Sequence, residues 1–248
     1  MSAEVIRIDT DAPAGAAFST RRGGVSAGRF GSLNLGSDKD DPDANVRANR
    51  AALCAELGLD ADVVEVNRQV HGAEVRAVGP PTGRGLFTGA LRGWPDADGL
   101  MTREPATGLL VLGADCLPVL LWRRDEPAVA AAHAGWRGLV AGVLEAAARS
   151  LGDTSRVGAA IGPGIGPCCY PVAPEVRDVF AGRFGEGVVA GEAVDLAASA
   201  EIALASAGVP PEAVQRVDAC TSCETERFFS YRRDGVCGRH GGVVWAVA

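Results

Sequence analysis

Three metal-binding side chains stand next to glycine-rich turns in this 248-residue chain. His71 lies in NRQVHG, Cys116 ends the apolar run LLVLGADC, and His133 ends AVAAAH before AGWRG. The chain contains only three histidines, and two of them share this context. Two imidazoles and one thiolate suit zinc, and a catalytic zinc ion usually has three protein ligands and one open position. His71, Cys116 and His133 therefore make a complete ligand set for one catalytic zinc site, although their spacing alone does not decide between this and other roles.

Other interpretations of the same residues stay open. Cys116 could be a nucleophile with His133 as its base, which would make the protein a thiol hydrolase. Two histidines, a cysteine and an axial methionine such as Met101 could form a blue-copper site, so copper is the second choice of metal. A multicopper oxidase needs many more histidines than the three present. Each residue taken alone could also be structural.

A second set of ligands follows near the C-terminal end. Cys220, Cys223, Cys237 and His240 have a CxxC…CxxH spacing that resembles a zinc ribbon. Whether they bind a second zinc ion is left open. The adjacent pair Cys168–Cys169 is interpreted as two buried thiols.

Helices and strands must position these groups. Helices are predicted over 42–57, with Asp41 as its cap, and over 139–151, 174–184 and 195–207, the last capped by Asp195. Apolar strands are predicted over 63–67, 109–113, 119–122, 129–132, 158–161 and 243–247. FFSYRRDG and GVVWAV are predicted to form a terminal hairpin, and 79–99 a long loop.

The order of these elements lacks a regular β-α-β alternation. It indicates an α+β, or irregular α/β, fold in which mixed β-sheets are layered with helices. A length of 248 residues suits a single domain covering 1–248. The sequence does not set the oligomeric state, and a monomer is assumed.

Composition and charge exclude several classes of function. The net charge of −7 argues against a nucleic-acid partner, which would call for a basic surface. No signal peptide is recognised, and the most apolar run, 109–122, is too short to span a membrane and contains Asp115. Seven cysteines, an odd number, are interpreted as reduced thiols of a cytoplasmic protein.

Several longer motifs carry a family resemblance. They run in order along nearly the whole chain: FSTRRGGVSAGRFGSLNLG, NVRANRAAL, NRQVHGAEV, DADGLMT, GADCLPVLL, AAHAGWRGLVAGVLE, AIGPGIGPCCYPV and CTSCETERFFSYRRDGVCGR. With these motifs the sequence resembles the YfiH-like family, also described as laccase-domain or polyphenol oxidoreductase proteins. The resemblance implies a YfiH-like fold, and zinc bound by His71, Cys116 and His133.

The resemblance also implies an activity. It implies phosphorolysis of purine nucleosides, namely adenosine, inosine and methylthioadenosine, and adenosine deamination as a second activity. Phosphate binding needs arginine forks or backbone N–H groups. Arg47, Arg50 and Arg137 lie in matched motifs, and with Gln69 they are the candidate substrate-binding residues. The expected partners are therefore purine nucleosides and phosphate.

Overall fold

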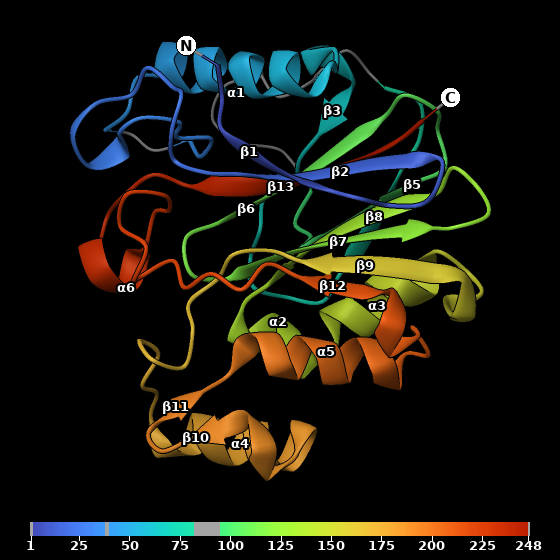
Figure 1. Cartoon of the computed structure of the whole chain (residues 1–248), viewed down its shortest axis with the longest axis vertical. Helices are drawn as coiled ribbons and strands as arrows, with labels where there is room; N and C mark the ends of the chain where they lie inside the picture. The colour runs from blue at the N-terminus through green and yellow to red at the C-terminus, as the bar shows by residue number, and fades with distance from the viewer. Residues whose placement is uncertain (1, 38–39, 82–94, 248) are drawn as a thin grey trace.

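Two β-sheets are stacked face to face between helices (Figure 1), in a computed structural model that describes residues 2–37, 40–81 and 95–247. The five-stranded sheet has the order β1 (Val5–Ile8), β2 (Ala14–Ser19), β13 (His240–Ala246), β6 (Gly108–Gly113) and β3 (Val64–Glu65). The six-stranded sheet has the order β12 (Val214–Arg216), β9 (Val157–Ile161), β7 (Leu117–Arg123), β8 (Val129–Ala134), β5 (Gly99–Thr102) and β4 (Val75–Val78).

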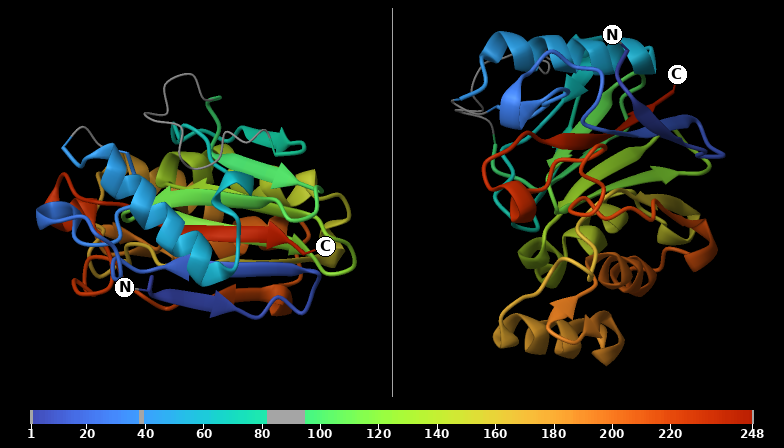
Figure 2. Two further views of the ribbon diagram at one scale, coloured as in Figure 1. Left: turned by 90° about the horizontal axis from the view of Figure 1, so that it is seen from above. Right: turned by 60° about the vertical axis from the view of Figure 1, so that its left-hand side comes forward.

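Helices cover the two outer faces. Helix α1 (Asp43–Leu57) lies on the five-stranded sheet and runs obliquely over it when seen from above (Figure 2). The other sheet is covered by α2 (Trp136–Ala141), α3 (Val143–Ser150) and α5 (Leu196–Ser206), with α4 (Pro174–Phe184) packed beyond them. A ribbon of β10 (Val189–Ala190) and β11 (Ala193–Val194) and a short α6 (Tyr231–Asp234) complete the described elements.

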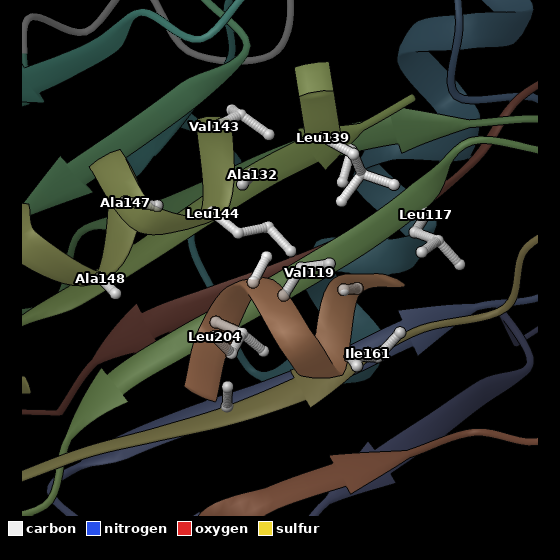
Figure 3. Packing of buried hydrophobic residues seen from close by; sticks show 14 of the residues in the cluster. Leu117, Val119, Ala132, Leu139, Val143, Leu144, Ala147, Ala148, Ile161 and Leu204 are labelled. Atoms are coloured by element: carbon white, nitrogen blue, oxygen red, sulfur yellow. The ribbon is translucent and has the colours of Figure 1, made fainter. Parts of the chain in front are cut away.

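Three apolar cores hold these layers together. One fills the space between the sheets and includes Phe18, Leu120 and Trp122. A second lies between the five-stranded sheet and α1. The third joins α2, α3 and α5 to the six-stranded sheet, where Leu144 and Leu204 meet side chains of β7 to β9 (Figure 3). Because β6, β7 and β8 are covered on both faces, their sequences are continuous apolar runs without polar alternation.

The predicted helices are all present, with two changes at their ends. Helix α1 begins at Asp43 with Pro42 at its cap, because the Asp41 carboxylate accepts hydrogen bonds from side chains, Ser26 among them, and does not cap the helix. The predicted helix over 139–151 is two helices, since Gly142 takes a left-handed φ of 90° between α2 and α3. Asp195 caps α5 as predicted, accepting from the N–H of Ala198.

The predicted terminal hairpin is wrong. Residues 231–234 form α6, and β13 pairs with β2 and β6, from the first half of the chain. Local turn signals favour the hairpin, but the apolar residues of β13 are buried between partners distant in sequence. Of the predicted loop over 79–99, residues 82–94 lie outside the described part.

The predicted fold class is confirmed. The structure is a mixed α+β arrangement of layered sheets and helices. Its consequence for the site is that the start of β7 lies beside the carboxyl end of β8, and only a short connection separates it from the end of β6.

Candidate functional site

Strand pairing brings Cys116 next to His133. Cys116 is the last residue before β7, and β7 pairs antiparallel with β8, with Pro118 opposite His133 and Leu117 opposite Ala134. The register therefore places Cys116 opposite Gly135. A Cβ atom on Gly135 would lie 2.9 Å from the Cys116 Sγ and 3.0 Å from the His71 Cδ2, so only glycine fits beside the cluster.

His71 completes the cluster from a different segment. It lies between β3 and β4 in a left-handed conformation, with φ of 61°. The ligand atoms of His71, Cys116 and His133 all lie within 4.8 Å of one another, and the two imidazole rings meet edge to face at 4.9 Å. The structure thus brings together the three residues that the sequence proposes as metal ligands.

Asp98 fixes the two histidines. Its buried carboxylate accepts backbone N–H hydrogen bonds from Val70 (3.1 Å), His71 (2.9 Å) and Gly72 (2.6 Å). It also bonds to Nδ1 of His133 at 2.8 Å. Burial alone would raise the pKa of Asp98, but these hydrogen bonds and the His133 charge lower it. A carboxylate on Nδ1 leaves Nε2 of His133 free for a metal, the arrangement typical of metal-binding histidines.

Cys116 and His133 form an ion pair in the metal-free protein. Burial would raise the pKa of the Cys116 thiol, but the charges of His133 and His71 and their hydrogen bonds lower it to about 6. Burial would lower the pKa of His133, but the Cys116 thiolate and Asp98 raise it to about 9. At neutral pH the pair is therefore thiolate and imidazolium.

Zinc binding at this cluster should release a proton from His133. A metal ligand must be a neutral imidazole or a thiolate, and above pH 7 only His133 of this pair still carries the proton to be displaced. Between pH 7 and 9 we expect the zinc affinity of the cluster to rise roughly tenfold per pH unit. Calorimetric zinc titration of metal-free protein in buffers of different ionisation enthalpy measures the number of protons released. The same titration of Cys116→Ala shows which part of the signal comes from this cluster. A zinc affinity independent of pH over this range would contradict the ion pair.

The cluster forms one wall of an open cavity of about 580 Å³. Gln69 and Arg137, two of the predicted substrate-binding residues, also line it. The remaining lining residues are Gly36, Ser37, Asn67, Arg68, Leu112, Gly113, Ala114, Asp115, Trp136, Tyr170, Tyr231, Arg232 and Arg239. The size of the cavity suits a drug-sized ligand such as a nucleoside.

Gln69 is held by the backbone of β6. Its Nε2 donates to the Leu112 carbonyl at 2.8 Å, and its Oε1 accepts from the Leu112 N–H at 2.8 Å. This pairing ties the segment before His71 to the strand that leads to Cys116. It leaves one amide hydrogen of Gln69 for a ligand in the cavity.

Arg47 and Arg50 lie on α1, and neither is among the described residues that line the cavity. Arg47 is exposed. Arg50 is buried, which lowers its pKa to about 10, and its Nε donates to the Leu35 carbonyl at 2.8 Å. Arg50 therefore holds the segment that carries Gly36 and Ser37 into the cavity wall.

Several cavity residues were missed by the sequence reasoning. Tyr170, Tyr231 and Arg232 lie in motifs that carry the family resemblance, but no pattern marks them as cavity residues. Asp115 lies directly before Cys116 and also lines the cavity. The structure shows its carboxylate accepting from Thr221 Oγ1 (2.7 Å) and the Arg232 N–H (2.6 Å), so it fixes the cavity wall.

The other candidate metal ligands lie outside the cavity. Met101 is buried on the helix side of β5 and is not among the described residues of the cavity. Cys220 and Cys223 do not group with Cys237 and His240 in the described part of the chain; they lie beside Cys168 and Cys169. The Cys168–Cys169 pair is exposed to half-buried, so the prediction of two buried thiols is wrong.

None of the helices in the described ranges is both long and apolar enough to cross a lipid bilayer.

Comparison with known proteins gives the family. Residues 15–247 match the sequence profile of a family described as multi-copper polyphenol oxidoreductase laccase. The chain is 39% identical to the Escherichia coli protein named purine nucleoside phosphorylase YfiH, over 94% of this chain and 93% of that protein. It is also 39% identical to a Streptomyces coelicolor protein named purine nucleoside phosphorylase, over 92% of this chain and 93% of that protein.

Solved structures of similar proteins support the same family. The crystal structure of YlmD from Geobacillus stearothermophilus is 32% identical, with a TM-score of 0.86 and coverage of 97% of this chain and 94% of that one. The crystal structure of a Bacillus licheniformis hypothetical protein YfiH is 30% identical, with a TM-score of 0.86 and coverage of 94% and 92%. The fold, the matched profile and the whole-length relatives together place this chain in the YfiH family of laccase-domain proteins, whose named members include purine nucleoside phosphorylases.

Proposed function

We propose that this protein is a zinc-dependent purine nucleoside phosphorylase that acts on adenosine, inosine and methylthioadenosine. The observation that carries the proposal is the cavity itself, where His71, Cys116 and His133 share one space with several guanidinium groups and aromatic rings. The names of the relatives support the same class of reaction. In that reaction a phosphate oxygen attacks C1′ of the ribose, and the C1′–N9 bond breaks with its electrons leaving on the purine.

The arginines of the cavity are the candidate groups for binding the phosphate substrate. The chain is acidic overall, yet Arg68, Arg137, Arg232 and Arg239 all line the cavity. Arg68 is paired with Asp96, and its Nη2 lies 2.6 Å from that carboxylate. Arg137 is stacked on the Trp136 ring at 4.4 Å, and its guanidinium has no hydrogen bond or ion pair to another described residue. It is therefore the side chain best placed to bind an incoming anion.

The aromatic rings suit the purine. Trp136, Tyr170 and Tyr231 all line the cavity, and a planar base stacks favourably on such rings. Arg232 stacks on Tyr170 at 4.7 Å and steadies it. Burial and the nearby Cys116 charge raise the pKa of Tyr170 to about 12, so its hydroxyl stays protonated at neutral pH. Tyr170 is thus available as a hydrogen-bond donor to the leaving purine.

The three-residue cluster fits zinc better than copper. Two imidazoles and a thiolate facing an open cavity match a catalytic zinc site, with Asp98 orienting His133. When bound, zinc supplies Lewis acidity. A blue-copper site needs a weak axial ligand, and the one considered, Met101, lies in the apolar core. Copper therefore remains the second choice.

Arg137→Ala should weaken phosphate binding selectively. A charge-assisted hydrogen bond contributes about 1.5–3 kcal/mol, so the KM for phosphate should rise more than about tenfold while the KM for inosine changes much less. Steady-state kinetics with each substrate varied in turn measures both constants. Arg149→Ala, an exposed arginine on α3, is the matched control and should leave both unchanged. An equal rise in both constants would argue against phosphate as the ligand of Arg137.

The sequence also predicts Arg47 and Arg50 as phosphate-binding residues. Since neither is among the described residues that line the cavity, we expect them to affect phosphate binding indirectly. The same kinetics on Arg47→Ala test that assignment. Because Arg50 holds the segment of Gly36 and Ser37, its substitution would act through the shape of the cavity.

Product analysis tests the proposed reaction. Purified protein is incubated with adenosine or inosine, with and without phosphate, and the products are separated by liquid chromatography. Release of adenine and hypoxanthine only in the presence of phosphate supports phosphorolysis. Inosine formed from adenosine without phosphate would support deamination as an additional activity. No turnover of either nucleoside by zinc-loaded protein would overturn the proposal.

A thiol hydrolase is the second candidate, because the geometry contains its catalytic groups. Cys116 is a thiolate in the metal-free protein, His133 is paired with it, and Asp98 orients His133, which is the order of a Cys-His-Asp triad. A cysteine bound to zinc cannot attack a substrate. Alkylation of Cys116 by iodoacetamide therefore separates the two functions. If the protein is a phosphorylase, bound zinc should protect Cys116 and the activity from iodoacetamide. If it is a hydrolase, alkylation of Cys116 should inactivate it and zinc should inhibit it.

We further propose a cytoplasmic location. The seven cysteines are all unpaired in the structure, in keeping with a reducing compartment. Fractionation of the source cells tests this directly.

A further inference from the structure

Four cysteines outside the catalytic cavity lie together. Cys168 and Cys169 come from the segment after β9, and Cys220 and Cys223 from the CTSC turn after β12. Their sulfur atoms all lie within 4.8 Å of one another. Two of these separations are 3.6 Å, from Cys168 to Cys223, and 3.4 Å, from Cys169 to Cys223. We name this group the four-cysteine cluster.

The backbone holds the two cysteine pairs against each other. Gly164 and Cys220 form an isolated parallel bridge, and the Thr221 N–H donates to the Gly164 carbonyl at 3.0 Å. The Gly166 N–H donates to the Cys220 Sγ at 3.3 Å. A Cβ on Gly166 would lie 3.3 Å from the Cys168 Sγ and 3.4 Å from the Cys220 Cβ, so the two segments leave little room for a side chain here.

The CTSC turn is itself braced. The N–H groups of Cys223 and Glu224 donate to the Cys220 carbonyl at 3.1 and 2.9 Å, which curls the turn so that both thiols face the same side. Arg233 donates to the carbonyls of Thr221 and Ser222 at 2.8 and 3.1 Å. Several contacts therefore hold each cysteine pair in its position within the cluster.

From this geometry we propose that the four-cysteine cluster is a second, structural zinc site. Zinc binds four thiolates tetrahedrally with Zn–S bonds of about 2.3 Å, which places the sulfur atoms about 3.8 Å apart. The separations of 3.4 and 3.6 Å lie slightly below that value, and all four sulfur atoms lie within 4.8 Å of one another. The N–H of Gly166 aimed at a sulfur is the type of outer contact that stabilises a bound thiolate. Closed coordination by four protein ligands leaves no position for substrate, so the role of the site is structural.

This zinc site would reinforce the wall of the catalytic cavity. Tyr170 follows Cys169 directly and lines the cavity. Thr221, inside the CTSC turn, donates to the carboxylate of Asp115, the residue before the catalytic-cluster cysteine. Zinc would cross-link these two segments, which otherwise meet through a few hydrogen bonds. The four-cysteine cluster shares no residue with His71, Cys116 and His133, so the proposal does not depend on the phosphorylase activity.

Metal analysis of purified variants tests the proposal. Wild-type protein loaded with zinc under reducing conditions and then desalted should hold about two zinc ions per chain. Cys220→Ser with Cys223→Ser should hold about one, and so should His71→Ala with Cys116→Ala. Cys54→Ser and Cys237→Ser are matched controls, since both cysteines are buried outside the clusters, and they should keep both ions. Unchanged zinc content in the Cys220/Cys223 variant would overturn the proposal.

A second measurement needs no variant. Alkylation of the native wild-type protein, mapped by mass spectrometry, should label Cys168 and Cys223 rapidly when zinc is removed, because both are exposed. Added zinc should protect all four cysteines of the cluster. Equal labelling with and without zinc, or recovery of Cys223 in a disulfide with Cys168 or Cys169 after purification under reducing conditions, would contradict a zinc site.

Discussion

Replacing Cys116 with alanine should remove the metal from the catalytic cluster and lower kcat/KM for inosine by more than about a hundredfold. Loss of an outer-shell partner of a metal site alone costs about 10–100-fold, and Cys116 is proposed to be a direct ligand. The substitution also removes the negative charge that helps to keep His133 protonated, so the buried His133 and the exposed His71 both lose their thiolate neighbour. Metal content and steady-state kinetics on the same sample measure the effect.

Two further variants make this result specific. Cys54→Ala also removes a buried thiol, but from α1, and should keep both activity and the metal. Cys116→Asp keeps an anionic metal ligand and removes the nucleophilic sulfur. Partial zinc binding at the catalytic cluster with partial activity in Cys116→Asp supports the metal role, whereas an inactive variant that holds as much zinc as wild type would favour Cys116 as a nucleophile.

Asp98→Asn should be the most disruptive substitution that keeps the size of the side chain. One carboxylate oxygen accepts from His71 N–H and His133 Nδ1, and the other from Val70 N–H and Gly72 N–H. Either orientation of an asparagine amide therefore turns an NH₂ group toward two donors. We expect the free energy of unfolding to fall by about 3 kcal/mol and the zinc affinity of the cluster to fall about 10–100-fold.

Chemical denaturation and zinc titration measure the two effects of Asp98→Asn. Asp96→Asn provides the matched control, because Asp96 lies two residues away in an exposed ion pair with Arg68. Such pairs contribute at most about 1 kcal/mol, so this variant should stay close to wild type. The pKa of Asp98 is lowered in the folded state, so its contribution to stability should be present at neutral pH and lost as the solution is acidified. An Asp98→Asn protein as stable as Asp96→Asn would contradict the role assigned to this carboxylate.

The three proposed metal ligands could be picked out from the sequence because their residue types are rare and their contexts are local. His71, Cys116 and His133 each stand at a glycine-rich turn beside an apolar run, and the strand register then brings Cys116 and His133 together. The contacts that orient these three side chains could not be predicted in this way. The carboxylate of Asp98 meets the segment around His71 from 27 residues away, and nothing in the spacing marks it among the many aspartates.

The same distinction between local and distant contacts explains the errors. Helices α4 and α5 were predicted closely because caps and periodicity act within one turn. The terminal hairpin was wrong because β13 finds its partners in β2 and β6. The zinc-ribbon spacing grouped Cys220 and Cys223 with residues that follow them in the sequence. Their neighbours in space are Cys168 and Cys169, 51 to 55 residues earlier, which the backbone bridge between Gly164 and Cys220 brings close.

The fate of the phosphate oxygen atoms tests the central proposal most directly. Zinc-loaded protein is incubated with inosine and phosphate labelled with heavy oxygen, and the sugar product is analysed by mass spectrometry. If the cavity binds phosphate for attack on C1′, the product is ribose 1-phosphate that carries all of the label, formed in equal amount to hypoxanthine. Hypoxanthine accompanied by free, unlabelled ribose, or no reaction at all, would contradict phosphorolysis.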